Sequence, residues 1–338
     1  MMQQITLPEE IVLRFYNEDE ECICIREISH INYGGQARIY KFNHGGNEYL
    51  LKAVFANDRK IFRTIDSIRQ KLLKEKELPE SIINRTLPIG QGCCNGNVFE
   101  GIGSFKFACL FVFKYLNGKS LTEVVPPVSA RYILDYLKNN NIDNFEIRKR
   151  IATDIAHILA LLEKNDIVHG DLQDNWLVDD EYKVHLIDIE GSGILKGNSW
   201  EWVPLAEGKP GYLRPSEDVK EGKVWIRKTT LHTDRWMGFN LIFNVLTGIK
   251  HPFFFLPVCD KEKINRLINQ INLDKKDWIP HCLDNSGFED LSDPGLRAFF
   301  EQLPIGLRSL FFQTFIIGYN DPESRASFQE IHKALITL

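Results

Sequence analysis

No apolar run in this sequence approaches the roughly 20 residues that a membrane-spanning helix requires. The longest runs, Phe107–Phe113 and Phe253–Cys259, have seven residues each. The first residues, which include Glu9, Glu10 and Arg14, lack the basic and then apolar pattern of a secretory signal. Basic charge is not in excess either, since 41 Lys+Arg stand against 46 Asp+Glu for a net charge of −5. We therefore expect a cytoplasmic protein with no membrane and no nucleic-acid partner.

None of the seven cysteines forms a C-x-x-C pair, which argues against a zinc ribbon. Their number is odd and Cys93 and Cys94 are adjacent, so we expect free thiols in a reducing compartment. With 338 residues, of which 43% are hydrophobic and 26% charged, the chain is not disordered. It is long enough to bury a large core without disulfides or a structural metal.

Strand patterns dominate the first third of the chain. The predicted strands are Cys22–Ile28, Arg38–Phe42, Tyr49–Phe55 and Phe107–Phe113. The turn signal His44-Gly45-Gly46-Asn47 joins two of them as a hairpin. Between these strands, a helical period predicts one helix over 58–78, with Ile61, Ile65, Ile68 and Leu72 on its inward face.

Helical patterns dominate after residue 117. The predicted helices span 129–140, 146–164, 236–247, 306–316 and 327–338, and two short strands are predicted at Trp176–Val178 and Val184–Asp188. The sequence thus predicts an α+β protein in which a small strand-rich half is followed by a larger helical half.

Asp171, Asn175 and Asp188 form the most informative chemical pattern. Asn175 follows Asp171 by four residues, and Asp188 comes 13 residues after Asn175, at the end of an apolar strand. An amide and a carboxylate can share a divalent metal, while a second carboxylate orients and deprotonates a hydroxyl. Phosphoryl transfer needs both, so the pattern favours a phosphotransferase.

The order of the motifs resembles that of the eukaryotic-like protein kinases, most closely their bacterial members, over about residues 25–335. The resemblance implies a two-lobed protein-kinase-like fold, with a small antiparallel β-sheet lobe and a large, mainly helical lobe. It assigns residues 1–24 to an N-terminal extension, 25–116 to the small lobe and 117–338 to the large lobe. ATP and Mg²⁺ are the cofactors it implies.

The stretch from Asn32 to Tyr40 is similar to the glycine loop that covers the nucleotide phosphates, although Asn32 and Ala37 replace two of the three family glycines. Lys52 matches the strand lysine that pairs with these phosphates. Further nucleotide contacts are implied for hinge residues and for the pocket floor. The implied nucleotide-binding residues are Asn32, Gly34, Gly35, Ala37, Ile39, Lys52, Phe113, Lys114, Leu116 and Leu177.

Lys52 requires a carboxylate partner. The inward series of the predicted helix leads next to Glu75, a charge on an otherwise apolar face, and an inward carboxylate needs a partner. We therefore predict that Glu75 pairs with Lys52. Glu77 is the alternative.

The resemblance implies that Asp171 accepts the hydroxyl proton and that Asn175 and Asp188 hold Mg²⁺. The loop departs from the family pattern, because only three residues separate Asp171 from Asn175 and Trp176 stands at the nominal amide position. Asp174 is then an alternative ligand. If Trp176 truly replaces the amide, one metal site is lost and the protein is a binding module.

Three later segments resemble protein-kinase elements. Gly208–Glu217 is similar to the substrate-docking loop, in which Lys209 would supply the cation that Gln173 lacks. Asp234 would hold the backbone of the catalytic loop, and Arg325 would be the buried partner of Glu217. These segments favour a protein kinase acting on Ser or Thr of a protein substrate, with a cognate phosphatase or signalling partner. The alternatives are a pseudokinase scaffold and an aminoglycoside- or choline-type small-molecule kinase, suggested by the H-G-D and I-D-I-E patterns.

Overall fold

The computed structural model of the chain describes two compact units. It describes residues 4–16, 22–33, 37–56, 60–75, 86–95, 107–126, 145–173, 175–197, 199–202, 219–221, 224–226, 229–248 and 303–338, with positions 78, 82 and 269. Unit 1 comprises Met1–Gly118 and His185–Gly191, and unit 2 comprises Lys119–Val184 and Ser192–Leu338. The stretch 185–191 thus belongs to the first unit although it lies far along the sequence.

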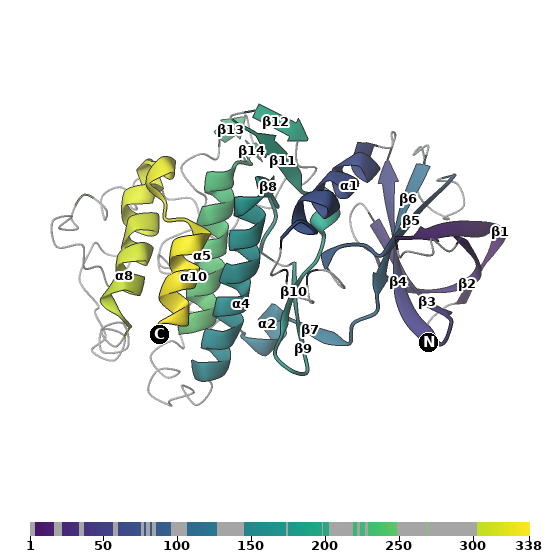
Figure 1. The fold of residues 1–338 in the computed structure, drawn as a ribbon, viewed down its shortest axis with the longest axis horizontal. Helices are drawn as coiled ribbons and strands as arrows, with labels where there is room; N and C mark the ends of the chain where they lie inside the picture. The colour runs from purple at the N-terminus through teal and green to yellow at the C-terminus, as the bar shows by residue number, and fades with distance from the viewer. Residues whose placement is uncertain are drawn as a thin grey trace. The chain divides into compact units, whose positions relative to one another are not determined.

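Unit 1 is built on a closed antiparallel barrel (Figure 1) with the strand order β1-β2-β3-β4-β6-β5. The strands are β1 Gln4–Phe15, β2 Cys22–Tyr33, β3 Ala37–His44, β4 Asn47–Ala56, β5 Gly90–Asn95 and β6 Phe107–Lys114. All four predicted strands are confirmed, and so is the hairpin turn. Gly45 and Gly46 both have positive φ values (57° and 79°), which suits the tight turn between β3 and β4.

Two strands, β1 and β5, were not predicted. Pro8, Glu9 and Glu10 interrupt the alternation of β1, and its pairing with β2 shifts register between Thr6 and Ile11. The sequence of β5, GQGCCN, has the composition of a loop. Its glycines have a packing reason, because a Cβ at Gly92 would lie 2.6 Å from the carbonyl oxygen of Val12. Small residues on β5 therefore let β1 close the barrel.

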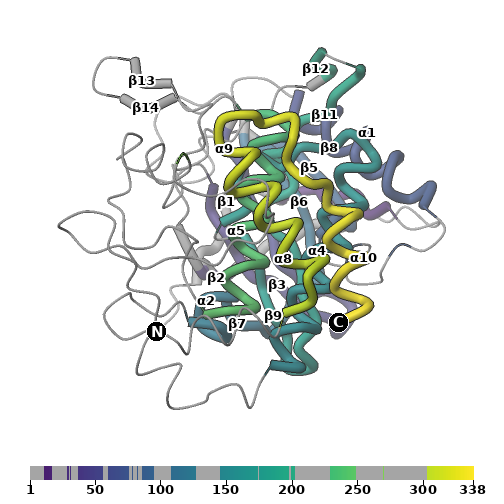
Figure 2. Tube along the Cα trace, turned by 90° about the vertical axis from the view of Figure 1, so that its left-hand side faces the viewer, coloured from purple at the N-terminus to yellow at the C-terminus, as the bar shows by residue number. Residues whose placement is uncertain are grey.

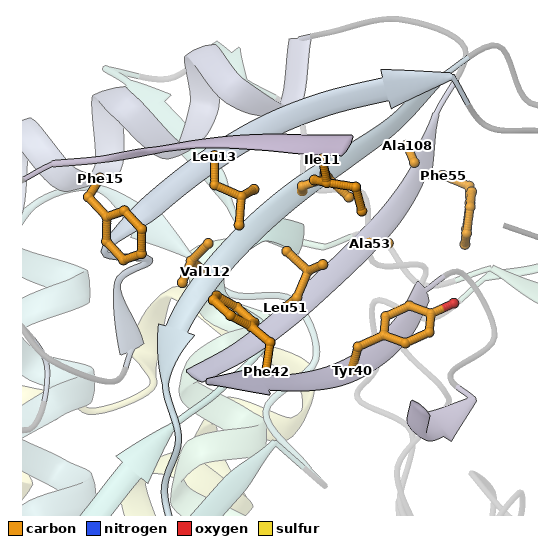
Figure 3. Close-up of a cluster of buried hydrophobic side chains, with 11 residues drawn as sticks. Ile11, Leu13, Phe15, Tyr40, Phe42, Leu51, Ala53, Phe55, Ala108 and Val112 are labelled. Atoms are coloured by element: carbon orange, nitrogen blue, oxygen red, sulfur yellow. The ribbon is translucent and has the colours of Figure 1, made fainter. Parts of the chain in front are cut away.

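Alternate strand residues fill the barrel interior (Figure 3). β1 contributes Ile11, Leu13 and Phe15 to this core, opposite Leu51 and its neighbours on β4. The remaining members are Tyr40, Phe42, Ala53, Phe55, Ala108, Leu110 and Val112. The segment expected to be an extension thus supplies core side chains.

The substitution Leu13→Ala is expected to lower the free energy of unfolding by about 3 kcal/mol, because it leaves a cavity in the barrel interior. Leu13 is fully buried, whereas its neighbour Val12 is 52% exposed. Val12→Ala is therefore the matched control, with an expected change below about 0.5 kcal/mol. Urea denaturation measures both. Equal effects of the two substitutions would mean that β1 contributes nothing to the core.

Helix α1 (Lys60–Leu72) packs on the outside of the barrel. Ile61, Ile65, Ile68 and Leu72 are buried, as the predicted inward series requires. The rings of Phe62 and Phe111 on β6 lie 5.4 Å apart. The helix ends at Leu72, six residues before the predicted end, and the next residue, Leu73, is 45% exposed.

The end of β1 is linked to α1 by polar contacts. The Tyr16 hydroxyl donates to Asp66 Oδ1 (3.1 Å), and the Arg69 guanidinium lies 4.5 Å from the centre of the Tyr16 ring. Burial, together with the Asp66 carboxylate, raises the pKa of Tyr16. The phenol therefore stays protonated and acts as a donor.

Unit 2 is mainly helical, and the helices α4, α5 and α10 lie side by side (Figures 1 and 2). Its described helices are α2 Leu121–Val124, α4 Phe145–Lys164, α5 Leu231–Thr247, α8 Ile305–Phe312, α9 Gly318–Asn320 and α10 Phe328–Ile336, with a π-helical turn at Gln313–Ile317 and a 3-10 turn at Pro322–Ser324. Aromatic side chains, among them Trp236, Phe239 and Phe315, pack between them. The predicted helix 129–140 lies outside the described residues.

Short strands complete the structure. β8 (Ile167–Val168), β11 (Gly193–Lys196) and β12 (Ser199–Trp202) form one sheet, and β13 (Val219–Glu221) pairs with β14 (Val224–Ile226). A further sheet has the order β10-β9-β7, with β7 Gly118–Ser120, β9 Trp176–Asp179 and β10 Val184–Leu186. The strands β9 and β10 are those predicted around the Asn175 and Asp188 pattern.

Candidate active site

Lys52 lies on the outer face of the barrel. In β4 the neighbouring residues Leu51 and Ala53 point into the core, so the alternation of the strand turns Lys52 outward. In register it lies between Ile39 on β3 and Phe111 on β6. It therefore shares its face of the barrel with α1, which packs against Phe111.

The Lys52 ammonium forms ion pairs with two carboxylates of unit 1. Its Nζ lies 2.5 Å from Asp188 Oδ1 and also contacts Glu190 Oε1. The side chain of Asp188 is 45% exposed, whereas those of Lys52 and Glu190 are only 11% and 5% exposed. One carboxylate is thus accessible to solvent and the other is enclosed.

A tight turn brings the two carboxylates to the same ammonium. Asp188 has a positive φ of 64°, unusual for a residue other than glycine, and precedes the 3-10 turn η5 (Ile189–Gly191). The Gly191 amide donates to the Asp188 carbonyl (3.2 Å), and η5 packs against α1. Backbone strain of this kind concentrates at functional sites.

Electrostatics favours the charged form of Lys52. Burial lowers the pKa of Lys52, but the carboxylates of Glu190 and Asp188 outweigh it and raise the pKa above its ordinary value. Burial raises the pKa of Glu190 above its ordinary value, the Lys52 ammonium offsets only part of that shift, and the Asp188 carboxylate adds to it. The ammonium is therefore retained at neutral pH, and Glu190 depends on Lys52 for its charge.

In unit 2, Asp234 holds the backbone that precedes Asp171. Its Oδ2 accepts a hydrogen bond from the His169 amide (2.6 Å) and its Oδ1 accepts one from the Gly170 amide (2.9 Å). Asp234 itself is buried in the first turn of α5, whose N-cap is Thr230. This is the backbone contact that the sequence led us to expect of Asp234.

Asp171 and Asn175 belong to one short loop. The Asn175 side-chain nitrogen donates to the Asp171 carbonyl (2.6 Å), which leaves Asn175 Oδ1 as the atom that can bind a metal. The Asp171 side chain is partly buried, and its amide donates to His169 Nδ1 (3.3 Å). The loop therefore carries the Asp171 carboxylate on backbone held by local hydrogen bonds, and an Asn175 amide whose nitrogen is engaged.

Trp176 is a core residue of unit 2. It is buried, and its indole N–H donates to the Leu172 carbonyl (2.7 Å). In β9 the residues Trp176 and Val178 face inward, while Leu177 on the other face is partly exposed. Trp176 thus has a packing role in unit 2.

Arg325 is buried, as expected. Its Nε donates to the Gly318 carbonyl (2.8 Å), its Nη1 donates to the His232 carbonyl (2.7 Å), and its guanidinium lies 5.0 Å from the Trp236 ring centre. Its expected partner Glu217 lies outside the described residues. Arg325 therefore joins α5 to the segment that precedes α10.

The remaining predicted site residues fall into two groups. Described residues are Asn32 on β2, Ala37 and Ile39 on β3, Phe113 and Lys114 on β6, Leu116 after it, and Glu75. Glu75 lies three residues beyond the end of α1 and its amide donates to the Leu72 carbonyl (3.0 Å). Outside the described residues lie Gly34, Gly35, Glu77, Asp174, Lys209 and Glu217.

Glu190 was missed as a site residue. The predicted partner of Lys52 was Glu75, whereas the carboxylates seen at Lys52 are those of Asp188 and Glu190. In the sequence, the pattern I-D-I-E suggested only a small-molecule kinase. A usable signal was present, since Glu190 is a charge in the otherwise apolar setting of Ile187 and Ile189, and an enclosed carboxylate needs a cation.

The oxygen ligands available suit Mg²⁺. Within the described ranges, no group of three or more His, Cys, Asp or Glu side chains forms a metal cluster. Mg²⁺ does not need one, because it usually takes one or two protein oxygens together with waters and substrate phosphates. Asp188, half exposed, and Asn175 Oδ1 are ligands of this type.

No model of a known protein family matches the chain. Among solved structures, it is similar to the ROP18 kinase domain in complex with AMP-PNP and sucrose, with a TM-score of 0.54 and 13% sequence identity. The match covers 98% of this chain and 85% of that domain. The fold is therefore a protein-kinase-like α+β fold. Across the described helices, none is both long enough and apolar enough to cross a membrane.

Proposed function

We propose that the protein is an ATP-dependent kinase that phosphorylates Ser or Thr hydroxyls of a protein substrate. The observation that carries the proposal is the enclosed Lys52 ammonium, paired with the half-exposed Asp188 on a kinase-like fold. A fixed ammonium beside an accessible carboxylate suits a triphosphate and its divalent ion. The similar ROP18 kinase domain was solved with AMP-PNP, which supports a nucleotide as the ligand.

Each residue of the candidate site has a separate task in this reaction. Lys52 would hold the phosphates of ATP, and the carboxylate of Asp171 would orient the substrate hydroxyl and accept its proton. The hydroxyl oxygen forms a bond to the γ-phosphorus while the bond from that phosphorus to the bridging oxygen breaks, and ADP leaves with that electron pair. Most of the rate would come from positioning and from neutralising charge.

The resemblance to protein kinases assigns Mg²⁺ to Asp188 and Asn175, of which Asp188 would offer a carboxylate oxygen in unit 1 and Asn175 its Oδ1 in unit 2. When bound, Mg²⁺ neutralises charge on the phosphate oxygens. The Asp234 carboxylate fixes the backbone of His169 and Gly170, and so sets the place from which Asp171 acts.

The test is incubation of the purified chain with Mg²⁺ and ATP labelled in the γ-phosphate. We expect label on the chain or on added protein substrates, with modified Ser or Thr residues mapped by mass spectrometry. Lys52→Met should reduce labelling about 100-fold or more. Lys183→Met, a change at an exposed lysine, is the control and should have no effect.

Two results would contradict the proposal. Label found only on aminoglycosides or choline would identify a small-molecule kinase. Tight binding of ATP without transfer to any of these acceptors would identify a pseudokinase.

A further inference from the structure

Glu190 is the most enclosed carboxylate of the candidate site. Its side chain is 5% exposed, and its Oε1 contacts the Lys52 ammonium. Among the described residues, neither carboxylate oxygen has a hydrogen-bond partner apart from that ammonium. A buried charge in this position is stable only while its single cationic partner stays in place.

We propose that Glu190 is the positioning residue of Lys52, which holds the ammonium toward the nucleotide phosphates and leaves Asp188 available for the metal ion. This inference rests on the proposed function. It moves the role that Glu75 was expected to play from the helix to the segment that follows Asp188.

The difference in exposure between the two carboxylates carries the argument. Asp188 pairs with Lys52 at 2.5 Å, and a carboxylate engaged by an ammonium is a poorer metal ligand. When Asp188 binds a metal ion, Lys52 still has Glu190 as a carboxylate partner. Because Glu190 is enclosed, water cannot take the place of the ammonium, and Glu190 stays paired with Lys52 while Asp188 binds the metal.

The fold fixes Glu190 from two sides. It belongs to η5, which begins immediately after the strained residue Asp188 and packs against α1. Lys52 lies on β4, a strand that is paired on one side with β3 and on the other with β6. Both ends of the ion pair are thus on anchored backbone, which is what a positioning contact requires.

The decisive experiment is a double-mutant cycle in the full chain, with phosphoryl transfer as the readout. Glu190→Gln is expected to lower kcat/KM for ATP about 10- to 100-fold, the size of a lost charge-assisted hydrogen bond. It should also raise the Mg²⁺ concentration needed for half-maximal activity, because Lys52 is then left with Asp188 alone. Glu190→Asp is expected to restore part of the activity.

If Glu190 acts through Lys52, the double variant Lys52→Met with Glu190→Gln should be no more than about twofold worse than Lys52→Met alone. The proposal would be overturned if the activity losses of Lys52→Met and Glu190→Gln multiplied in the double variant. Normal activity of Glu190→Gln would overturn it as well. A greater loss of activity in Glu75→Gln than in Glu190→Gln would mean that Glu75, as predicted from the sequence, positions Lys52. Glu181→Gln, the same change at a 72% exposed side chain, is the control for charge.

A second readout needs no catalysis. In urea denaturation, we expect the stability losses of Lys52→Met and Glu190→Gln to be non-additive, because each substitution breaks the same ion pair. The unfolding equilibrium constant of the double variant should be at least about tenfold smaller than the two single losses together predict, whereas Lys52→Met and Glu181→Gln should be additive. Thermal unfolding checks that both variants are folded.

This readout separates the two claims. Non-additive stability losses in a protein that transfers no phosphate would retain the Lys52–Glu190 pairing and remove only the proposed function. Additive losses of Lys52→Met and Glu190→Gln would overturn the pairing, whatever the activity.

Discussion

Asp171→Asn is expected to lower the rate of phosphoryl transfer about 1,000-fold, because an amide cannot accept the hydroxyl proton and general-base groups contribute about 100- to 10,000-fold. The binding of ATP should change little, since Asp171 is assigned to the hydroxyl and not to the nucleotide. Single-turnover transfer of the labelled γ-phosphate measures the first quantity, and equilibrium titration with ATP and Mg²⁺ measures the second.

Asp180→Asn provides the matched control for this change. Asp180 is exposed in the turn that follows β9, so the same exchange of carboxylate for amide should leave the transfer rate unaltered. If Asp171→Asn retained more than about one tenth of the wild-type rate, Asp171 would not be the catalytic base of this protein.

Asp234→Ala is expected to reduce stability and activity together. The carboxylate accepts hydrogen bonds from two backbone amides, those of His169 and Gly170, and its removal leaves both buried donors without their acceptor. Two unsatisfied buried donors cost about 3 kcal/mol of unfolding free energy. The loop that carries Asp171 then loses its anchor, so we expect transfer to fall about 100-fold or more in the protein that remains folded.

Asp234→Asn separates anchoring from charge. The amide has one acceptor oxygen, so it satisfies only one of the two backbone donors, and we expect a loss of stability about half as large as that of Asp234→Ala. Chemical denaturation and transfer assays measure both variants. A fully stable and fully active Asp234→Ala protein would show that the loop is held by other contacts.

The pairing of Lys52 gives a physical reason for the positive φ of Asp188. In an extended strand, the side chains at positions 188 and 190 would point to the same side but would start about 6.6 Å apart along the backbone. The left-handed turn at Asp188 instead folds the chain back, so that both carboxylates reach one ammonium. The cost of that backbone conformation is offset by the two ion pairs.

Local pattern was sufficient for much of the fold. The apolar runs predicted β4 and β6, the glycine pair predicted the hairpin between β3 and β4, and the helical period identified the buried face of α1. The same holds for α4, whose predicted range of 146–164 differs from the observed Phe145–Lys164 by one residue. Periodicity worked here because each element buries one continuous face.

Local pattern also brought attention to Asp171, Asn175 and Asp188, whereas Lys52 and Asp234 were identified by the resemblance to protein kinases. It did not find β1 and β5, since Pro8 and the glycines of β5 conceal strands that exist only because the barrel closes on them. Pairing with neighbours far along the chain, and not propensity, makes these segments strands.

The sequence by itself therefore determined the elements with one continuous apolar face, among them β4, β6, α1 and α4, and which side chains carry charge. The partner of Lys52 was decided by the tertiary structure alone. A helical series pointed to Glu75, but α1 ends at Leu72, and the turn after Asp188 brings an enclosed Glu190 to the ammonium instead. Ion pairing depends on where backbones 136 residues apart meet, and on how much water the surrounding side chains exclude, and neither is written in a local pattern.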